Sequence, residues 1–528
     1  MKATVKRYQV IGDLLTANAV EIPDADAVVF KDRRISWKEY DEESDRAAMG
    51  LLNLGVKKGD RIGIYMPNWP EFLFVYLGAA KIGAVAVPVS WRFTPQEIKF
   101  IINNSGVSIL VMAGEFMGMD LVRNIESIRP ELPTLNKIVI YDSNKSFVEM
   151  LPYKQFAVKP GPALKKARGA VKTGDPVLFI YTSGTTGVPK AAVLTHKNLI
   201  AYSRAQVEAT GFTRGHSLLL NIPLNHSGGA VMAVMSCLTT GNKLVMMDMF
   251  DPEKTLQVIQ DEKVTCIGQV PAQYAMELLS PNVDKYDLKS IRVAVVSSQP
   301  CPSDLIVAIK QRMGVMPLNA YGLTESTGTI TFTHPEHGEE KLKHTVGIPI
   351  PGVQVAIMDQ DNNILPQGQA GEVVIKGDVV MKGYWKRPDE DRRVLDRKGY
   401  LHTGDMGKID NDGYLMIIGR KKEMFIRGGE NVYPPEVEEA ISQHADVFMV
   451  AVLGRPDPIM GEVGRAYIIR KPNTSSTPED IKAFLKDRLA RYKIPEDVIF
   501  RDQLPFTPLG KVKKLTLYEE IKAEFAGK

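Results

Sequence analysis

The strongest constraint on the fold of this chain is a repeated alternation between short apolar runs and longer amphipathic runs. The apolar runs are rich in β-branched residues, which predicts buried strands, and the amphipathic runs between them predict helices. This order favours parallel sheets covered by helices, because parallel strands need a crossover between them. The predicted strands are 61–66, 108–111, 137–141, 177–181, 243–247 and 291–297, and the predicted helices are 95–103, 251–263, 272–279 and 303–313.

The pattern changes near residue 347. Short predicted strands at 353–359, 371–377 and 414–419 are separated by turns rich in Gly, Pro, Asn and Asp. Such punctuation is typical of a small β-rich subdomain. Much earlier in the chain, the basic and Pro-rich segment 152–172 is predicted to be a surface connection.

A last unit follows Arg420, where strands and helices alternate in an α+β pattern. The length of 528 residues leaves room for about three to four domain-sized units. We therefore predict the α/β class, with a large N-terminal region of parallel α/β sheets. The predicted parts are the N-terminal region over 1–419, a β-rich part of it over about 347–419, and an α+β C-terminal domain over 420–528.

Composition excludes several function classes. Hydrophobic residues make up 44% and charged residues 24%, which is ordinary for a soluble globular protein. The net charge of +4 is small for this length, so we expect no nucleic-acid partner and no membrane-surface role. Three scattered cysteines, Cys237, Cys266 and Cys301, suit a reducing compartment. With no signal peptide or integral membrane segment recognised, the predicted location is cytoplasmic.

The sharpest local feature is the string YTSGTTGVPK at 181–190, which directly follows a predicted strand. Hydroxyl and glycine positions in a row can bend tightly and aim donors at one anion, and Lys190 adds a charge for terminal phosphates. The string is not a Walker A loop, because Pro189 precedes Lys190 and Ala191 follows it. The plainer alternative is a polar turn between strands.

This string resembles the signature of the adenylate-forming superfamily, which includes acyl-CoA synthetases, peptide-synthetase adenylation domains and luciferases. Further motifs follow in the family's order and cover nearly the whole chain. Five ordered motifs are far more specific than any one of them, and the set is most similar to the AMP-forming acyl-CoA synthetases. These further motifs are NAYGLTE at 319–325, YLHTGD at 400–405, GRKKE at 419–423 with GGEN at 428–431, and PLGKV at 508–512.

The resemblance implies an ATP site. Tyr321 would stack on the base, Glu325 would bind Mg²⁺ as a hard oxygen ligand, and Asp405 and Arg420 would hold the ribose. The alternatives at these positions are a core tyrosine, a solvated carboxylate and a surface ion pair. The expected ATP- and AMP-binding residues are Thr182, Ser183, Gly184, Thr185, Thr186, Lys190, Ser298, Gln299, Pro300, Asn319, Ala320, Tyr321, Gly322, Thr324, Glu325, Asp405, Arg420 and Lys511.

The acid pocket departs from the family's pattern at two places. Ser298-Gln299-Pro300 stands where the family usually has Gly-Ala-Pro, and Asn225 replaces the aromatic residue that often precedes His226. His226 would contact the carboxylate, and a purely structural histidine is an equal alternative. No Asp lies near this point to hold an α-amine. We therefore expect a hydrophobic carboxylic acid, either compact and aromatic or alicyclic, or alternatively a medium or long fatty acid.

By the same resemblance, the C-terminal domain is mobile and rotates about a hinge at Lys422. Lys511 would bridge the carboxylate and the α-phosphate, and after rotation Gly428 and Gly429 would face the CoA arm. The implied reaction forms acyl-AMP and pyrophosphate, then acyl-CoA and AMP, with ATP, Mg²⁺ and coenzyme A as cofactors and co-substrates. The expected catalytic residues are Lys511, Thr185, Glu325 and His226.

Two other functions stay open at this point. One is adenylation followed by transfer to a carrier-protein thiol, and the other is a catalytically idle nucleotide-binding sensor. The expected partners are the small-molecule acid, ATP and CoA, with a homodimer left open.

Overall fold

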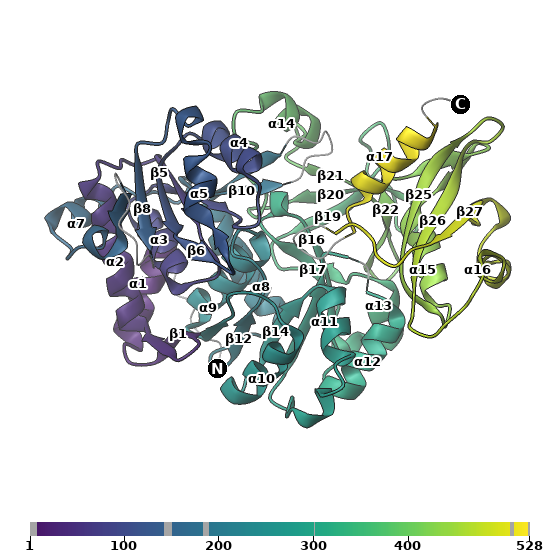
Figure 1. The fold of residues 1–528 in the computed structure, drawn as a ribbon, viewed down its shortest axis with the longest axis horizontal. Coiled ribbons are helices and arrows are strands. Elements are labelled where there is room, and N and C mark those ends of the chain that lie inside the picture. Colours follow the sequence, from purple (N-terminus) through teal and green to yellow (C-terminus); the bar gives the residue numbers. More distant parts are fainter. Residues whose placement is uncertain (1–7, 142–149, 183–188, 300, 507–511, 526–528) are drawn as a thin grey trace.

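The computed structural model describes residues 8–141, 150–182, 189–299, 301–506 and 512–525. Figure 1 shows a large body of sheets and helices formed by most of the chain, with a smaller C-terminal sheet at one side. This arrangement confirms the predicted α/β class, with the parallel sheets in the larger part and an α+β unit after them.

The first large sheet has a parallel centre, as the alternation of apolar and amphipathic runs predicts. Strands β16, β15, β14, β12, β13 and β1 pair in parallel, and β17, β18 and β2 add antiparallel edges. In sheet order the strands are β18 Ile348–Pro349, β17 Thr329–Phe332, β16 Leu318–Gly322, β15 Val293–Ser297, β14 Cys266–Gln269, β12 Ser217–Leu220, β13 Lys243–Met246, β1 Asp26–Phe30 and β2 Arg33–Ser36.

The second large sheet contains the described ends of the predicted phosphate string, with Tyr181 and Thr182 on β10 and Lys190 on β11. Its core is parallel, but β10 and β11 pair antiparallel, so 183–188 joins two neighbouring strands. The strand β11, which includes Lys190, is absent from the predicted elements. In sheet order the strands are β11 Lys190–Thr195, β10 Pro176–Thr182, β4 Val85–Val89, β3 Arg61–Tyr65, β5 Val107–Ala113, β8 Lys137–Tyr141 and β9 Met150–Pro152; a small hairpin pairs β6 Glu115–Phe116 with β7 Met119–Asp120.

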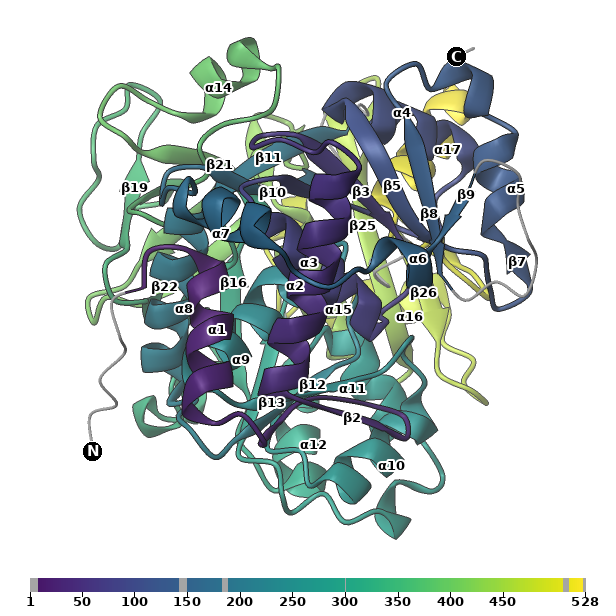
Figure 2. The same cartoon turned by 90° about the vertical axis from the view of Figure 1, so that its left-hand side faces the viewer.

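Helices pack on these sheets, and α3, Pro70–Lys81, is buried along its whole length. Figure 2 shows α1, α2 and α3 grouped together, and all three are in contact. Gly78 permits the closest approach, because a Cβ there would lie 2.8 Å from the backbone oxygen of Ser44. The other helices of this part are α1 Ile11–Glu21, α2 Trp37–Asn53, α4 Pro95–Ser105, α5 Leu121–Glu126, α8 His196–Thr210, α9 Val234–Thr240, α10 Pro252–Glu262, α11 Pro271–Leu278, α12 Ser303–Met313, α13 Glu339–His344 and α14 Pro388–Val394.

Short turns of helix complete the connections. A π-helical stretch, η2 Gly228–Ala233, runs directly into α9. The 3-10 turns are η1 Arg129–Glu131, η3 Val283–Lys285, η4 Thr324–Ser326, η5 Pro335–His337 and η6 Arg491–Lys493.

The part that the turn-rich sequence predicts to be β-rich forms a sheet, and its strands pair antiparallel. It places β21 and β22 beside each other with Asp405 opposite Arg420. In order the strands are β19 Gln354–Met358, β20 Gly371–Lys376, β21 Leu401–Ile409 and β22 Leu415–Arg420.

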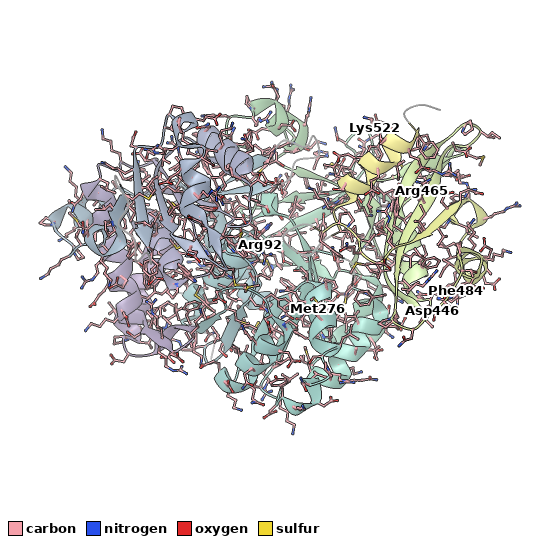
Figure 3. All side chains as sticks on the ribbon, viewed as in Figure 1. Arg92, Met276, Asp446, Arg465, Phe484 and Lys522 are labelled. Atoms are coloured by element: carbon pink, nitrogen blue, oxygen red, sulfur yellow. The ribbon has the colours of Figure 1, made fainter. Side chains whose placement is uncertain are left out.

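The C-terminal unit has its own sheet and its own apolar clusters. Arg465, labelled in Figure 3, lies on β26 and pairs with Glu524 of α17 at 2.6 Å, which ties that helix to the sheet. The strands are β24 Glu430–Val432, β23 Phe425–Arg427, β26 Gly461–Arg470, β25 Val447–Asp457 and β27 Asp497–Phe500, and the helices are α15 Pro434–Ser442, α16 Pro478–Leu485 and α17 Lys514–Phe525.

One predicted segment is wrong. Residues 152–172 are not a plain surface connection, because they hold the short helices α6, Tyr153–Phe156, and α7, Pro162–Gly169. Tyr153, Phe156 and Leu164 are buried in the main core. These three apolar side chains anchor the segment to the core although its composition is basic. In the part of the chain that the structure describes, no helix is long and apolar enough to cross a membrane.

Candidate active site

Three of the predicted nucleotide residues meet where β16 of the first large sheet approaches the paired strands β21 and β22. The pairing of β21 with β22 sets Asp405 opposite Arg420, and Asp405 Oδ1 lies 3.2 Å from Arg420 Nε. Tyr321, on β16, donates its hydroxyl to Asp405 Oδ2 over 2.6 Å. Desolvation and the charge of Asp405 raise the pKa of Tyr321 well above its ordinary value, so the phenol stays protonated and donates. Asp405 and Arg420 thus form the ion pair that was the alternative to ribose binding, and this ion pair lies inside the predicted nucleotide site.

Glu325 lies on η4 and is held by two hydroxyl groups. Tyr384 donates to Glu325 Oε1 over 2.7 Å, and Thr182, at the end of β10, donates to the same oxygen over 3.4 Å. Burial and the charge of Glu325 raise the pKa of Tyr384 well above its usual range, which keeps this hydroxyl a donor. The carboxylate is therefore oriented next to the predicted phosphate string.

Lys190 is buried and already paired. Its Nζ lies 2.6 Å from Glu390 Oε2 on α14 and 5.3 Å from the centre of the Tyr384 ring. The hydrogen bond from Lys190 lowers the pKa of Glu390, so this carboxylate stays charged. An anion that used Lys190 would have to compete with Glu390.

The remaining residues of the second nucleotide motif lie close by. Asn319 donates to the carbonyl oxygen of Leu342, and its buried Oδ1 accepts no hydrogen bond from the described residues. Gly322 has no room for a side chain, because a Cβ there would lie 2.2 Å from the carbonyl oxygen of Gly328. Ala320 is buried on β16 and Thr324 begins η4, between Tyr321 and Glu325.

Ser298 occupies a backbone conformation that favours glycine. It follows β15 directly and has φ of 77°, where a side chain is strained. The family's usual glycine at this position would adopt it freely. Ser298 lines a cavity, and Gln299 follows it, half-buried.

That cavity has a volume of about 120 Å³ and lies against β12, β14 and β15. His226 and Ser227, just before η2, form part of its wall, as do Ser297 and Leu323. The expected pocket segments therefore contribute to one space. Residues that the sequence did not single out also line it, among them Gln206, Leu218, Ile222, Met232, Gln269, Val270 and Val295.

The predicted hinge lies in a chain of charged contacts. Glu423 is 3.9 Å from Arg420 and 3.4 Å from Lys514, and Lys514 is 2.7 Å from Glu438. Lys422 is exposed beside these residues. Gly428 and Gly429, between β23 and β24, have φ of 58° and 91°, a left-handed geometry that favours glycine.

Several predicted residues lie outside the described residues, so no geometry is given for them. They are Ser183, Gly184, Thr185, Thr186, Pro300 and Lys511.

Two contacts in this site were not foreseen from the sequence. Tyr384 and Glu390 follow the β-rich sheet's β20 by several residues, and no spacing ties them to Glu325 or Lys190. The acidic start of the helix after Pro388 is the only signal near Glu390. Gln269 is better indicated by the sequence than Glu390, because Gln269 ends a parallel strand and ligands of α/β sheets bind at such ends.

Comparisons with known proteins agree with this architecture. The family model for the AMP-binding enzyme matches residues 15–385, and the model for the AMP-binding enzyme C-terminal domain matches residues 436–511. The chain belongs to the AMP-binding enzymes, the adenylate-forming superfamily that its motifs resemble. The prediction of an AMP-forming acid–thiol ligase is confirmed at the level of this family.

Similar proteins are named as ligases of several acids. A long-chain-fatty-acid–CoA ligase of Mycobacterium tuberculosis, FadD13, is 34% identical over 97% of this chain and 99% of its own length. A CoA ligase of Rhodococcus jostii, named for a propanoyl group on a methylated, dioxo-substituted octahydroindene, is 34% identical over 96% and 97%. The crystal structure of the anthranilate CoA ligase AuaEII with anthranoyl-AMP is 25% identical with a TM-score of 0.87, covering 98% of each chain.

Proposed function

We propose that this protein activates a hydrophobic carboxylic acid with ATP and then transfers the acyl group to CoA. The carboxylate attacks the α-phosphate, which gives acyl-AMP and pyrophosphate, and the CoA thiol then displaces AMP from the acyl carbon. The observation that carries this proposal is that Asp405 contacts both Tyr321 and Arg420, while Gly322 and Leu323, between Tyr321 and Glu325 in the chain, line a mostly apolar cavity. Tyr321 lies near the carboxyl end of β16, and the carboxyl ends of parallel strands are where open α/β sheets bind ligands.

In the nucleotide site, Asp405 accepts from the ribose hydroxyls and Arg420 donates to them. Asp405 is already oriented by Tyr321 and Arg420, so it needs little reordering when ribose arrives. The ring of Tyr321 lies under the base, and the unpaired Oδ1 of Asn319 suits an amino donor. Thr182, Thr324 and Lys190 supply donors for the phosphates.

The residues present fit Mg²⁺ bound together with the nucleotide. Within the described residues, no three acidic, His or Cys side chains gather as a metal cage. Mg²⁺ commonly uses one or two carboxylates plus substrate phosphates, and Glu325 is the oriented carboxylate next to the phosphate string. When bound, the ion neutralises charge on the phosphates, while Tyr384 and Thr182 hold Glu325 in place.

The size of the cavity supports a compact acid. An apolar cavity of roughly 150 Å³ admits one benzene ring, and this one has about 120 Å³. A single aromatic or alicyclic ring is therefore the first candidate for the acyl group. A medium or long fatty acid is the second, because the Mycobacterium tuberculosis relative is named for long chains.

The second step requires a different site from the first. The C-terminal part, from about residue 420, rotates about Lys422, which removes Lys511 and brings Gly428 and Gly429 toward CoA. Their left-handed backbone and lack of side chains let a thin pantetheine arm approach. The free cysteines are consistent with the cytoplasmic location we propose, and a homodimer remains an untested prediction.

Acid-dependent exchange of labelled pyrophosphate into ATP tests this function. With a panel of benzoate-like, alicyclic and C4–C16 acids, we expect exchange without CoA, and release of AMP and acyl-CoA when CoA is added. Exchange with no thioester until a carrier protein is supplied would favour the carrier-dependent ligase. No exchange with any acid, despite ATP binding, would favour the idle sensor.

A further inference from the structure

Two glutamine side chains that line the acid cavity each have a buried amide oxygen that accepts no hydrogen bond from the described residues. These oxygens are Oε1 of Gln206, on α8, and Oε1 of Gln269, at the end of β14. Both side chains line the cavity and are buried, with 8% and 2% of their surface exposed. Buried polar groups in native proteins are nearly always paired, so an unpaired one calls for an explanation such as a ligand or an ordered water.

The Gln269 amide is fixed from behind. Its Nε2 donates to Oε1 of Glu277, on α11, over 2.5 Å, and Glu277 is completely buried. Since Glu277 engages the amide nitrogen, the end of the amide that remains for a ligand is the acceptor oxygen. Glu277 thus acts as a positioning residue for Gln269.

The surroundings of the two oxygens are mostly apolar. Leu218, Ile222, Met232 and Val295 line the same space. In such a wall, an acid without a donor leaves the acceptors unpaired, and a site built to hydrogen-bond a substrate rejects analogues that lack the bonding group. The two glutamines would therefore let the site select acids that carry a hydrogen-bond donor, in addition to selecting acids of the right shape.

Building on the proposed function, we propose that the acid carries a hydrogen-bond donor on a compact apolar body, and that Gln206 and Gln269 recognise it. The donor is a hydroxyl or an amino group remote from the reacting carboxylate. This narrows the substrate class from a plain hydrophobic acid to a hydroxylated or aminated one. It also distinguishes this pocket from one that fits an unsubstituted alkyl chain.

Matched sets of acids test this inference with the full-length protein. Each set holds the hydroxy, amino, methoxy and unsubstituted forms of benzoic or cyclohexanecarboxylic acid, alongside C4–C16 fatty acids, and kcat/KM is measured from AMP release with CoA present. We expect a donor-bearing acid to exceed its methoxy and unsubstituted partners by about 10-fold or more. The methoxy form controls for size and for an oxygen that cannot donate, and the hydroxy and amino arms show which donor is recognised.

Variants assign the preference to the two glutamines. Gln206→Leu and Gln269→Leu should each lower the ratio of kcat/KM for the donor-bearing acid to kcat/KM for the unsubstituted acid by about 10-fold. Glu277→Gln keeps an acceptor for Gln269 Nε2 and should retain the preference, whereas Glu277→Leu should lose it. Gln257→Leu, at an exposed position of α10, is the matched control and should change nothing.

The outcomes separate this inference from the proposed function. Unsubstituted or fatty acids used as well as the donor-bearing ones would overturn the inference while leaving the ligase activity intact, and would assign the unpaired oxygens to ordered water. Variants that leave the preference unchanged would overturn the role of the glutamines. Turnover of no acid at all would overturn both. If a leucine variant fails to fold, as judged by its melting temperature, the wild-type preference still decides the substrate class.

Discussion

At the scale of single residues, the pairing of Lys190 with Glu390 makes a direct prediction about ATP binding. Lys190 is buried, so its ammonium needs an anionic partner, and in the structure Glu390 supplies it at 2.6 Å. In Glu390→Gln, Lys190 would lose the carboxylate that pairs with it among the described residues, and the bound phosphates would take that place. We expect the melting temperature without ATP to fall, and the KM for ATP to fall several-fold with a larger stabilisation by ATP.

Asp389→Asn is the matched control, because Asp389 lies next to Glu390 but is exposed and pairs with Arg392. It should leave both the KM and the ATP-induced stabilisation unchanged. An unaltered KM for ATP in Glu390→Gln would show that Lys190 does not contact the phosphates.

Glu277 predicts a pH dependence of stability. Burial raises its pKa to about 8, against a hydrogen bond from Gln269 that favours the charged form, while the ordinary value is 4.5. Between these two pH values the folded protein holds a proton that the unfolded chain has released. The free energy of unfolding therefore falls as pH rises through this window, by at most about 1.4 kcal/mol per pH unit, and levels off above pH 8.

Glu277→Gln removes that titration. The melting temperature of the variant minus that of the wild type should therefore increase from pH 5 to pH 8. The exposed Glu131→Gln, whose partner is Lys99, should show a constant difference over the same range. A constant difference for Glu277→Gln as well would mean that Glu277 is ionised in the folded protein.

At the scale of elements, the end of β15 is strained at Ser298, whose φ is 77°. An L-residue in this region costs about 1–2 kcal/mol, and part of the gain from glycine is offset by its greater freedom in the unfolded chain. Ser298→Gly should therefore be roughly 0.5–1 kcal/mol more stable than Ser298→Ala, which keeps the strained backbone. Urea unfolding of both variants measures this difference, and equal stability would show that the turn relaxes in solution.

The hydrophobic periodicity of the sequence predicted the strands that are buried on both faces. It did not predict elements that depend on contacts with residues far away in the chain. Apolar, β-branched runs such as 137–141 match β8, because a strand buried on both faces needs little else. The strand β11 was missed, since it pairs antiparallel with β10, whereas the alternation of strands and helices predicts parallel pairs joined by crossovers. The helices α6 and α7 were missed because three buried side chains, not composition, hold them down.

The candidate site divides in the same way. Asp405, Arg420 and Tyr321 were predicted from their motifs. They lie in contact because β21 and β22 pair at Asp405 and Arg420, and Tyr321 of β16 reaches Asp405. Tyr384, Glu390, Gln206 and Gln269 depend on contacts between residues far apart in the chain, such as Tyr384 with Glu325, and a single sequence carries no such pairing.

At the scale of the whole molecule, charged contacts near the hinge link the C-terminal unit to the rest of the described chain. Asp405, Arg420, Glu423 and Lys514 form a continuous path from the proposed ribose site to the start of α17. Such contacts are exchangeable at modest cost, unlike a large apolar interface. Such contacts suit the rotation that we propose for this domain.

The two half-reactions of Lys511→Ala test this account most directly. In the first, the acid and MgATP are mixed without CoA, and pyrophosphate release is followed; in the second, synthetic acyl-AMP is mixed with CoA, and the thioester is followed. We predict that the variant loses the first half-reaction by several orders of magnitude and keeps the second near the wild-type rate. Equal loss of both half-reactions, or wild-type rates in both, would contradict the proposed rotation of Lys511 into and out of the site.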